Sequence, residues 1–283
     1  MLKTALLTSA ALAMLGLAGT AHAGKVFLTG HDPDFHAQGQ ASGQHELTVA
    51  LNFVTSGTYA GGTTKFLFVE SELAPTSGHL IGENGLNAIG LTEGVNYDEV
   101  DAAGLAALPN FNGYSAIVVA SDFGGMLTDA EIQELVARKT DIANFVNAGG
   151  GLAAFAECGV GNPACNSDLV NASTPLFGFV PITATSVNTV APYTVTGYGA
   201  SLGLTNADVS DCCTHNSFAS SSGLNVVDYD QNGVPTTLAG DVQIGGTGFG
   251  VPEPAAWTLL LLGFGGLGAR LRSARSTTAR ARA

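Results

Sequence analysis

Positive charge is almost absent from the central part of this sequence. Between residues 24 and 251 there are four basic side chains against 22 acidic ones, a formal charge of −18. A surface of this kind repels nucleic acid and anionic lipid, and it tolerates divalent cations. The chain therefore has no features of a nucleic-acid-binding protein, and we expect no nucleic-acid partner.

Charged residues of either sign are also scarce, at 12% of the 283 residues, whereas glycine occurs 38 times. This composition suits an exported, loop-rich protein better than a cytosolic enzyme. The sequence contains no obvious internal repeat, and its length allows one sizeable domain plus processing segments.

The first 23 residues have the order of a secretory signal. Lys3 supplies the positive start, residues 5–18 the apolar run, and Ala21-His22-Ala23 an A-x-A cleavage site. The alternative is a first buried helix, but the cleavage site lies directly before the start of a strand. We expect export through the Sec machinery and a mature chain that begins at Gly24.

A strand–helix–strand unit organises the rest of the chain. Residues 116–121 and 152–156 are apolar runs typical of strands, and residues 128–148 between them have the apolar period of a helix. The glycines at 149–151 supply a left-handed stop. Because both strands are almost free of polar residues, we expect them side by side and parallel in a sheet covered on both faces.

The start of this helix carries a capping box, formed by Thr128 and Glu131. Lys139 lies inside the apolar face of the same segment. This position predicts either a lysine stem that snorkels along the surface or a break in the helix near Lys139.

The remaining pattern completes an α/β fold. Further strands are expected at residues 25–29, 65–69, 97–100, 182–195, 224–228, 234–238 and 241–244, and further helices at 42–54 and 101–108. The expected fold is a doubly wound, mostly parallel sheet of flavodoxin-like type with β-rich C-terminal additions. The domain covers residues 24–244, a glycine-rich linker covers 245–251, and a separate tail covers 252–283.

Histidine and carboxylate side chains gather at the ends of two expected strands. The loop after the first strand holds His31, Asp32, Asp34 and His36, and Glu157 ends the strand at 152–156. Ligands of open α/β sheets bind at the carboxyl ends of the strands, so convergence is possible there. His nitrogen and Asp oxygen suit zinc or manganese.

His215 is a further candidate metal or ligand residue in this set. The alternative interpretation of the His31–His36 loop is a polar turn in which Asp and His cap the next helix, and Pro33 makes simultaneous ligation awkward. A divalent metal is thus the one candidate cofactor.

Four cysteines lie in the exported part: Cys158, Cys165, Cys212 and Cys213. An even number in an oxidising compartment favours disulfides. We favour links between the Cys158–Cys165 loop and the Cys212–Cys213 pair, or a local Cys158–Cys165 bridge. A zinc site of four thiolates is disfavoured, because adjacent cysteines do not easily share a tetrahedron.

Asp228, Asp230 and Asn232, followed by Gly233, match the first half of a calcium loop. The bidentate glutamate of such a loop is missing, since Ala239 stands at its twelfth position. The flanking strands explain the same residues as a hairpin turn, with weak calcium binding as the alternative.

The C-terminal tail has three parts in a fixed order. The motif Pro252, Glu253 and Pro254 precedes an apolar run at 255–269, and Arg270 and Arg272 begin the basic end. This tail resembles a PEP-CTERM sorting signal. The resemblance implies recognition by an exosortase in a Gram-negative bacterium, often one that makes extracellular polysaccharide.

The tail also suggests a route through the cell. Fifteen residues give a helix of about 22 Å, shorter than a bilayer core of about 30 Å. We expect the tail to hold the chain briefly at the inner membrane, facing the periplasm, before it reaches the cell surface or the extracellular matrix. The alternative is a simple C-terminal membrane anchor, which the short span disfavours. Exosortase is the expected partner there, and extracellular polysaccharide is a further candidate partner.

The central domain resembles the class I glutamine-amidotransferase-like fold, and within it the ThuA-like group. The resemblance rests on residues 145–157, Phe-Val-Asn-Ala-Gly-Gly-Gly-Leu-Ala-Ala-Phe-Ala-Glu. The family places a nucleophilic cysteine in a G-x-C-x-G turn at the end of this strand, and that position falls on Ala156. Cys158 comes two residues late, and His215 stands where the family places its later histidine.

These observations lead to three hypotheses of function. The first is a non-catalytic, surface-sorted binding or structural protein, with no catalytic residue. The second is a metal-assisted hydrolase of extracellular carbohydrate that uses the histidines and carboxylates named above. The third is a matrix protein stabilised by calcium at Asp228 and Asp230.

Overall fold

The computed structural model describes residues 23–56, 65–71, 82–122, 127–157, 175–210, 212–245 and 248–250. All of them belong to one compact unit, His22–Val251. The predicted secretory signal, Cys158, Cys165 and the sorting tail lie outside the described residues, so the predictions made for them stay predictions.

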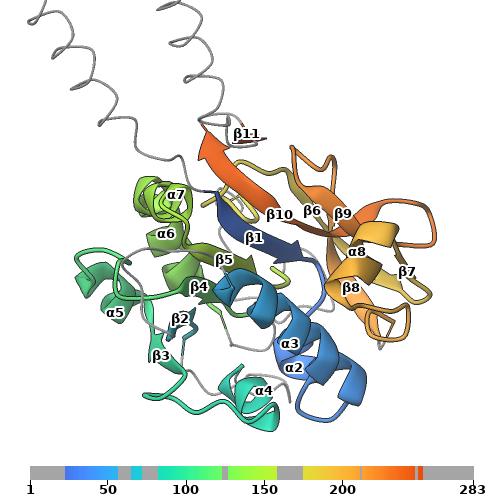
Figure 1. The fold of residues 1–283 in the computed structure, drawn as a ribbon, viewed down its shortest axis with the longest axis horizontal. Helices are drawn as coiled ribbons and strands as arrows, with labels where there is room; N and C mark the ends of the chain where they lie inside the picture. The colour runs from blue at the N-terminus through green and yellow to red at the C-terminus, as the bar shows by residue number, and fades with distance from the viewer. Residues whose placement is uncertain are drawn as a thin grey trace, which may run out of the picture. The chain divides into compact units, whose positions relative to one another are not determined.

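One side of the main sheet consists of five neighbouring strands that run parallel to one another; Figure 1 shows their arrangement. Their order across the sheet is β3 (Tyr97–Val100), β2 (Phe66–Val69), β4 (Ala116–Val119), β5 (Gly151–Ala154) and β1 (Gly24–Thr29). The prediction that β4 and β5 lie side by side and parallel is confirmed, and β1 pairs with the other edge of β5. In a flavodoxin-like order the first strand lies next to the second; here β1 lies beyond β5 instead.

The sheet continues past β1 with antiparallel strands. β10 (Pro235–Gly245) pairs with β1, and β9 (Asn225–Tyr229) and β7 (Thr194–Val195) follow it. The predicted hairpin is confirmed as β9 and β10. The prediction of a separate strand at 241–244 is wrong, because β10 runs through these residues without a break to pair along all of β1.

The β-rich C-terminal additions also include pairs outside the main path. β6 (Ala184–Val190) and β8 (Cys213–Phe218) form a two-stranded antiparallel sheet, and β11 (Gly248–Gly250) pairs with β10. β8 packs against β10 and reaches the end of β1. This strand carries His215 into the neighbourhood of the parallel sheet.

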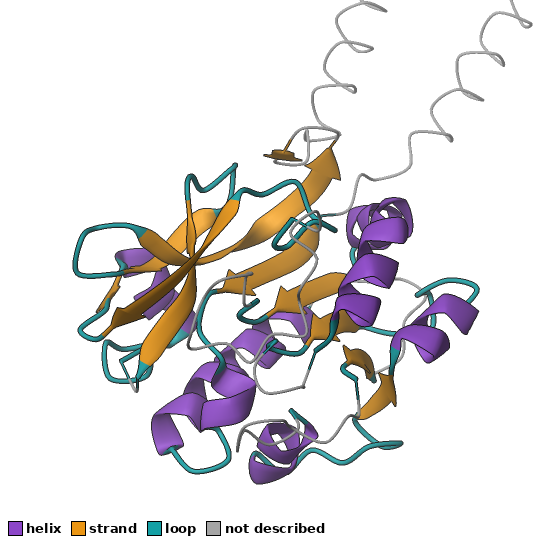
Figure 2. Ribbon diagram, turned by 180° about the vertical axis from the view of Figure 1, so that it is seen from behind, coloured by secondary structure: helices purple, strands orange, loops and turns teal. Residues whose placement is uncertain are grey.

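Helices cover both faces of the sheet, as Figures 1 and 2 show from opposite sides. On one face α3 (Ala41–Thr55) packs on β1 and β5, and on the other α7 (Lys139–Asn147) packs on β1 and β10. The alternation of β1 explains this: Phe27 belongs to the core under α3, whereas Val26 and Leu28 belong to the core under α7. The remaining helices are α2 (Pro33–His36), α4 (Glu83–Ala88), α5 (Ala102–Ala107), α6 (Asp129–Ala137) and α8 (Gly197–Leu202).

The predicted helix at 128–148 is two helices, α6 and α7, with a break at Arg138. The predicted capping box of Thr128 and Glu131 is present at the start of α6. The break also removes the conflict at Lys139, which is exposed and does not lie in the apolar face. Gly149 ends α7 with a φ of 100°, the left-handed stop expected there.

Candidate functional site

Backbone hydrogen bonds bring several chain segments together at the carboxyl end of the parallel strands. The Ala156 N–H donates to the His31 carbonyl at 2.9 Å, and the Asp122 N–H donates to the Ala156 carbonyl at 2.7 Å. The His215 N–H donates to the Gly30 carbonyl at 2.7 Å. The segments after β1, β4 and β5 therefore meet β8 at one place. The sequence predicted this for the segments after β1 and β5.

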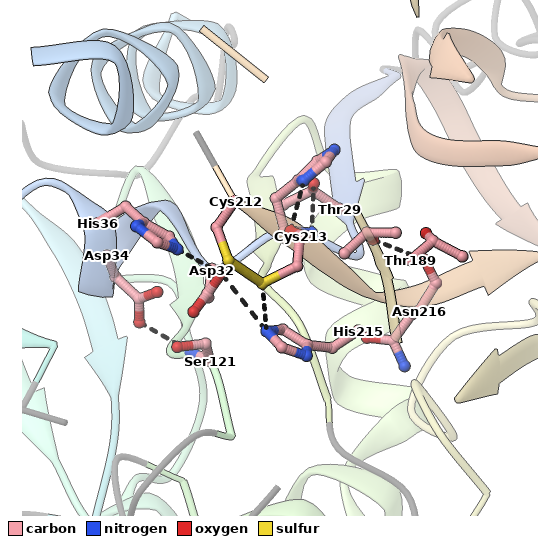
Figure 3. Close-up of polar contacts among 12 residues, drawn as sticks. Thr29, Asp32, Asp34, His36, Ser121, Thr189, Cys212, Cys213, His215 and Asn216 are labelled. Carbon is pink, nitrogen blue, oxygen red and sulfur yellow. Dashed lines mark hydrogen bonds and ion pairs between the residues drawn. A yellow bond between two sulfur atoms is a disulfide. The ribbon is translucent and has the colours of Figure 1, made fainter. Parts of the chain in front are cut away.

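Side chains of the predicted metal loop, His31–His36, point to two different sides of the short helix α2. Asp32 and His36 are four residues apart and face the same way, with the Asp32 Oδ1 3.4 Å from the His36 Nε2. The same Oδ1 lies 3.7 Å from the Nε2 of His215 (Figure 3). The structure thus unites three predicted residues, and we call Asp32, His36 and His215 the imidazole–carboxylate cluster.

Asp34 points away from this cluster. Its Oδ2 accepts a hydrogen bond from the Ser121 N–H at 2.8 Å. Glu70, directly after β2, accepts one from the Gly82 N–H at 2.7 Å. A Cβ at Gly82 would lie 2.7 Å from the Glu70 carboxylate and 3.1 Å from that of Asp34, so both carboxylates flank the same point.

The environment of this carboxylate pair disfavours two negative charges. Burial raises the pKa of Asp34 to about 7, although the Ser121 N–H lowers it and the Asp32 carboxylate raises it again. Burial also raises the pKa of Glu70, and the neighbouring carboxylates of Glu99 and Asp34 raise it further. Both carboxyl groups therefore hold a proton more tightly than exposed carboxyl groups do.

His31 forms a separate ion pair with Asp228 on β9. The His31 Nε2 lies 3.4 Å from the Asp228 Oδ1, and its Nδ1 lies 3.2 Å from the Cys213 carbonyl oxygen. Burial alone would lower the pKa of His31, but the carboxylates of Glu46 and Asp228 outweigh it and raise the pKa to about 9. His31 is therefore charged at neutral pH and already paired.

Glu157 is fully buried, and its carboxylate faces a different neighbour. Its Oε2 accepts a hydrogen bond from the Phe177 N–H at 2.6 Å. Phe177 adopts a φ of 53°, an uncommon left-handed conformation for a non-glycine residue. Burial raises the pKa of Glu157 to about 8, partly offset by this N–H donor.

The predicted six-residue constellation is thus divided. Asp32, His36 and His215 are joined; His31 pairs with Asp228, Asp34 with Ser121, and Glu157 with Phe177. Within the part of the chain that the structure describes, no hydrogen bond or ion pair connects the Glu157 carboxylate to these imidazoles. Asp32 stands at the N-cap position of α2, as the alternative interpretation has it, but its side chain makes no cap hydrogen bond there.

A disulfide joins the adjacent Cys212 and Cys213 beside the cluster (Figure 3). This bond contradicts the favoured prediction of links between this pair and Cys158 or Cys165, because neither sulfur of the pair is available for a distant partner. Adjacent cysteines were not expected to bridge each other. The other alternative, a local Cys158–Cys165 bridge, lies outside the described residues.

The residues proposed for calcium serve the hairpin between β9 and β10. Asp230 Oδ1 accepts hydrogen bonds from the N–H groups of Asn232 and Val234, each at 2.8 Å, and Gly233 has a φ of 77°. Asp228 turns inward, where Thr236 donates a hydrogen bond to the same Oδ1 that contacts His31. The hairpin interpretation of this motif is confirmed, and weak calcium binding stays a prediction.

Several buried carboxylate oxygens at this end of the sheet have no hydrogen-bond partner among the described residues: Asp34 Oδ1, Glu70 Oε1, Glu157 Oε1 and Asp228 Oδ2. A buried oxygen in this state costs free energy unless a proton, a water or a cation satisfies it. Carboxylate and imidazole donors together suit zinc or manganese. The imidazole–carboxylate cluster has donors of this kind, but none of these four oxygens belongs to it.

Glu70, Ser121 and the His31–Asp228 pair were missed by the sequence analysis. Glu70 and Ser121 follow β2 and β4 as closely as His31 follows β1. The rule that ligand-binding residues follow the carboxyl ends of parallel strands could have found both. Asp228 carried no such signal, because its neighbourhood depends on the antiparallel pairing of β9 with β10.

The position that would carry an amidotransferase nucleophile holds Ala156, fully buried and fixed by backbone hydrogen bonds on both sides. Ala154 and Cys158 stand where a G-x-C-x-G turn centred on Ala156 would have its glycines. No family model matches this sequence, and no curated protein matches it.

Proposed function

We propose that this chain is an exported protein, sorted to the cell surface or extracellular matrix, whose α/β domain has a binding or structural role. The observation that supports the absence of amidotransferase catalysis is Ala156. A methyl group cannot attack a carbonyl carbon, and Ala156 is fully buried.

The sequence supports the export part of this proposal. Residues 1–23 have the order of a secretory signal, and residues 252–283 have the order of a sorting tail that an exosortase would recognise. Among the helices of the described ranges, none has the length and apolar character needed to cross a membrane. The acidic domain would be released from its transient membrane attachment when the tail is processed.

Three measurements test this proposal. Intact-mass analysis of the protein from its native host should give a chain that starts at Gly24 and lacks the basic end; a mass that retains everything through Ala283 would contradict processing. Deletion of residues 252–283 should change the location of the protein. Treatment with an electrophilic glutamine analogue should leave Cys158 unlabelled, whereas labelling that depends on His215 would contradict the non-catalytic role.

The imidazole–carboxylate cluster favours a second candidate, a metal-assisted hydrolase of extracellular carbohydrate. In this mechanism His36 and His215 would hold a divalent ion with Asp32, and the ion would polarise the bond under attack. The test is hydrolysis of the native host's polysaccharide with added zinc or manganese, with EDTA and with Asp32→Asn. A hydrolysis rate that neither EDTA nor the substitution lowers would contradict this candidate.

A further inference from the structure

The adjacent Cys212 and Cys213 lie against the imidazole of His36, which the sequence predicted as a metal ligand together with other histidines and carboxylates rather than with cysteines. The ligand atoms of His36, Cys212 and Cys213 all lie within 4.8 Å of one another. They line a small cavity of about 10 Å³ that His31 and Asp32 also border. A space of this size accepts one water molecule or one ion.

A second imidazole approaches the same sulfur atoms. The Nε2 of His215 lies 3.9 Å from the Sγ of Cys213 (Figure 3). Asp32 contacts the Nε2 atoms of both histidines, so its carboxylate keeps the two rings turned toward this point. Cys212, Cys213 and His36 line the small cavity, and His215 approaches the Cys213 sulfur without lining the cavity itself.

We propose that Cys212, Cys213 and His36 form a redox-gated zinc site, with His215 as the fourth ligand. While the disulfide is intact the two sulfur atoms are poor ligands, and the site is closed. An external dithiol opens it: two electrons and two protons pass to the Cys212–Cys213 bond, which breaks to give two thiols, and the dithiol becomes a disulfide. Binding of Zn²⁺ then releases the two thiol protons.

The distances suit this ion. With bonds of about 2.0–2.3 Å, the ligand atoms of one tetrahedral zinc site lie about 3.3–3.8 Å apart. The 3.9 Å between His215 Nε2 and Cys213 Sγ is already close to that range. Adjacent cysteines do not easily share a tetrahedron, so this site requires the two sulfur atoms to move apart to this spacing once their bond breaks. The His36 ligand atom, within 4.8 Å of both sulfur atoms, needs to approach by about 1 Å. A soft two-thiolate set selects zinc or copper(I) over magnesium or calcium.

A neighbouring amide supports His36 in this role. The side-chain amide of Gln40 lies 2.8 Å from the His36 Nδ1, on the side of the ring away from Asp32. An amide can present its nitrogen or its oxygen, so Gln40 can accept the proton of Nδ1–H when Nε2 binds the metal. Such a partner fixes the tautomer and the ring orientation of a metal-bound histidine.

This inference does not depend on the proposed function. A surface-sorted binding protein and a hydrolase could each contain the site. The hydrolase candidate requires Asp32 as a ligand and predicts metal binding in any redox state. The zinc site proposed here requires the two thiolates and therefore predicts binding only after reduction.

The test uses the full chain, reduced without oxygen and freed of reductant, titrated with Zn²⁺ against a chromophoric competitor. A Cys158→Ser/Cys165→Ser variant removes the other two thiols and should still bind one zinc ion per chain when reduced. Oxidised protein and a Cys212→Ser/Cys213→Ser variant should bind zinc more weakly. Loss of an outer-shell partner lowers metal affinity roughly 10–100-fold, and loss of the two thiolates should lower it by at least that much. His36→Ala should weaken binding to a similar extent. Zinc affinity that is equal in the reduced and oxidised states, or unchanged in Cys212→Ser/Cys213→Ser, would overturn the proposal.

A second measurement needs no variant. Zinc should protect Cys212 and Cys213 of the reduced natural chain from iodoacetamide, as read by peptide mass, and Co²⁺ in place of zinc should give a thiolate-to-metal charge-transfer band. Full alkylation of both cysteines in the presence of saturating zinc would also overturn the site, whether or not the variants fold.

Discussion

The side chain of Asn216 holds the backbone of Glu157 at two points. Its Oδ1 accepts a hydrogen bond from the Glu157 N–H at 2.7 Å, and its Nδ2 donates to the Glu157 carbonyl at 2.5 Å. Both residues are fully buried. This amide takes the place of a strand partner and joins the end of β5 to β8, so the parallel sheet and the C-terminal additions share one site.

Asn216→Ala should therefore destabilise the domain more than an ordinary polar substitution. It leaves a buried N–H and a buried carbonyl without partners, which should cost roughly 2–4 kcal/mol of the free energy of unfolding. Urea unfolding measures this loss. Asn232→Ala, in the exposed turn between β9 and β10, is the matched control and should change the free energy little. Equal effects of the two substitutions would show that the Asn216 contacts contribute nothing of their own.

The buried carboxyl of Glu157 predicts how stability depends on pH. Its pKa is about 8 in the folded chain, against 4.5 as the ordinary value, because burial disfavours the charged form. The folded state therefore binds the proton more tightly than the unfolded state, and stability from this group falls as the pH rises from about 4.5 to about 8.

Glu157→Gln should remove this dependence, because a neutral amide keeps the acceptor for the Phe177 N–H without the buried charge. In EDTA the variant should gain stability relative to the natural chain between pH 5 and pH 9, by a few kcal/mol at most. Unfolding curves across this range provide the measurement, with the exposed Glu93→Gln as control. A difference that stays constant with pH would contradict the raised pKa.

Arg138 stabilises the break between α6 and α7. Its Nη1 donates to the Leu105 carbonyl at 2.6 Å, and its guanidinium lies 4.3 Å from the centre of the Phe111 ring. Arg138→Ala should lower the free energy of unfolding by roughly 2–4 kcal/mol. Arg138→Lys should restore only part of it, since an ammonium lacks the planar fork. Lys139→Ala, at the exposed neighbour, is the control and should have little effect.

The sequence predicted the parallel centre of the fold because its signals are local. The capping box of Thr128 and Glu131, the left-handed stop at Gly149 and the apolar strands each specify structure within a few residues. The position of β1 beyond β5 was not predictable in this way. It depends on the long antiparallel pairing of β1 with β10, across more than 200 residues of sequence.

The sequence predicted one part of the candidate site, because that part depends on local signals, and it did not predict the part that depends on distant pairing. Asp32 and His36 are four residues apart, so one turn of helix unites them, and the same turn directs Asp34 elsewhere. The pairing of Asp228 with His31, and the disulfide beside His36, depend on how β8 and β9 fold over the end of β1. No periodicity within one segment encodes those contacts.

A substitution at Gly30 tests how closely β8 approaches the end of β1. A Cβ at this position would lie 2.1 Å from the Asn216 carbonyl oxygen and 2.4 Å from the Thr214 Oγ1, so only glycine lets β8 pass the end of β1 this closely. Gly30→Ala should push β8 away, weaken the 2.7 Å hydrogen bond from the His215 N–H and separate His215 from Asp32. Overpacking of this kind should cost about 1–3 kcal/mol or more in urea unfolding. Gly39→Ala is the matched control, since a Cβ there meets no atom within 4 Å. If Gly30→Ala unfolded at the same urea concentration as Gly39→Ala, the close approach of β8 to β1 would be refuted, and with it the proximity of His215 to Asp32 on which both metal proposals depend.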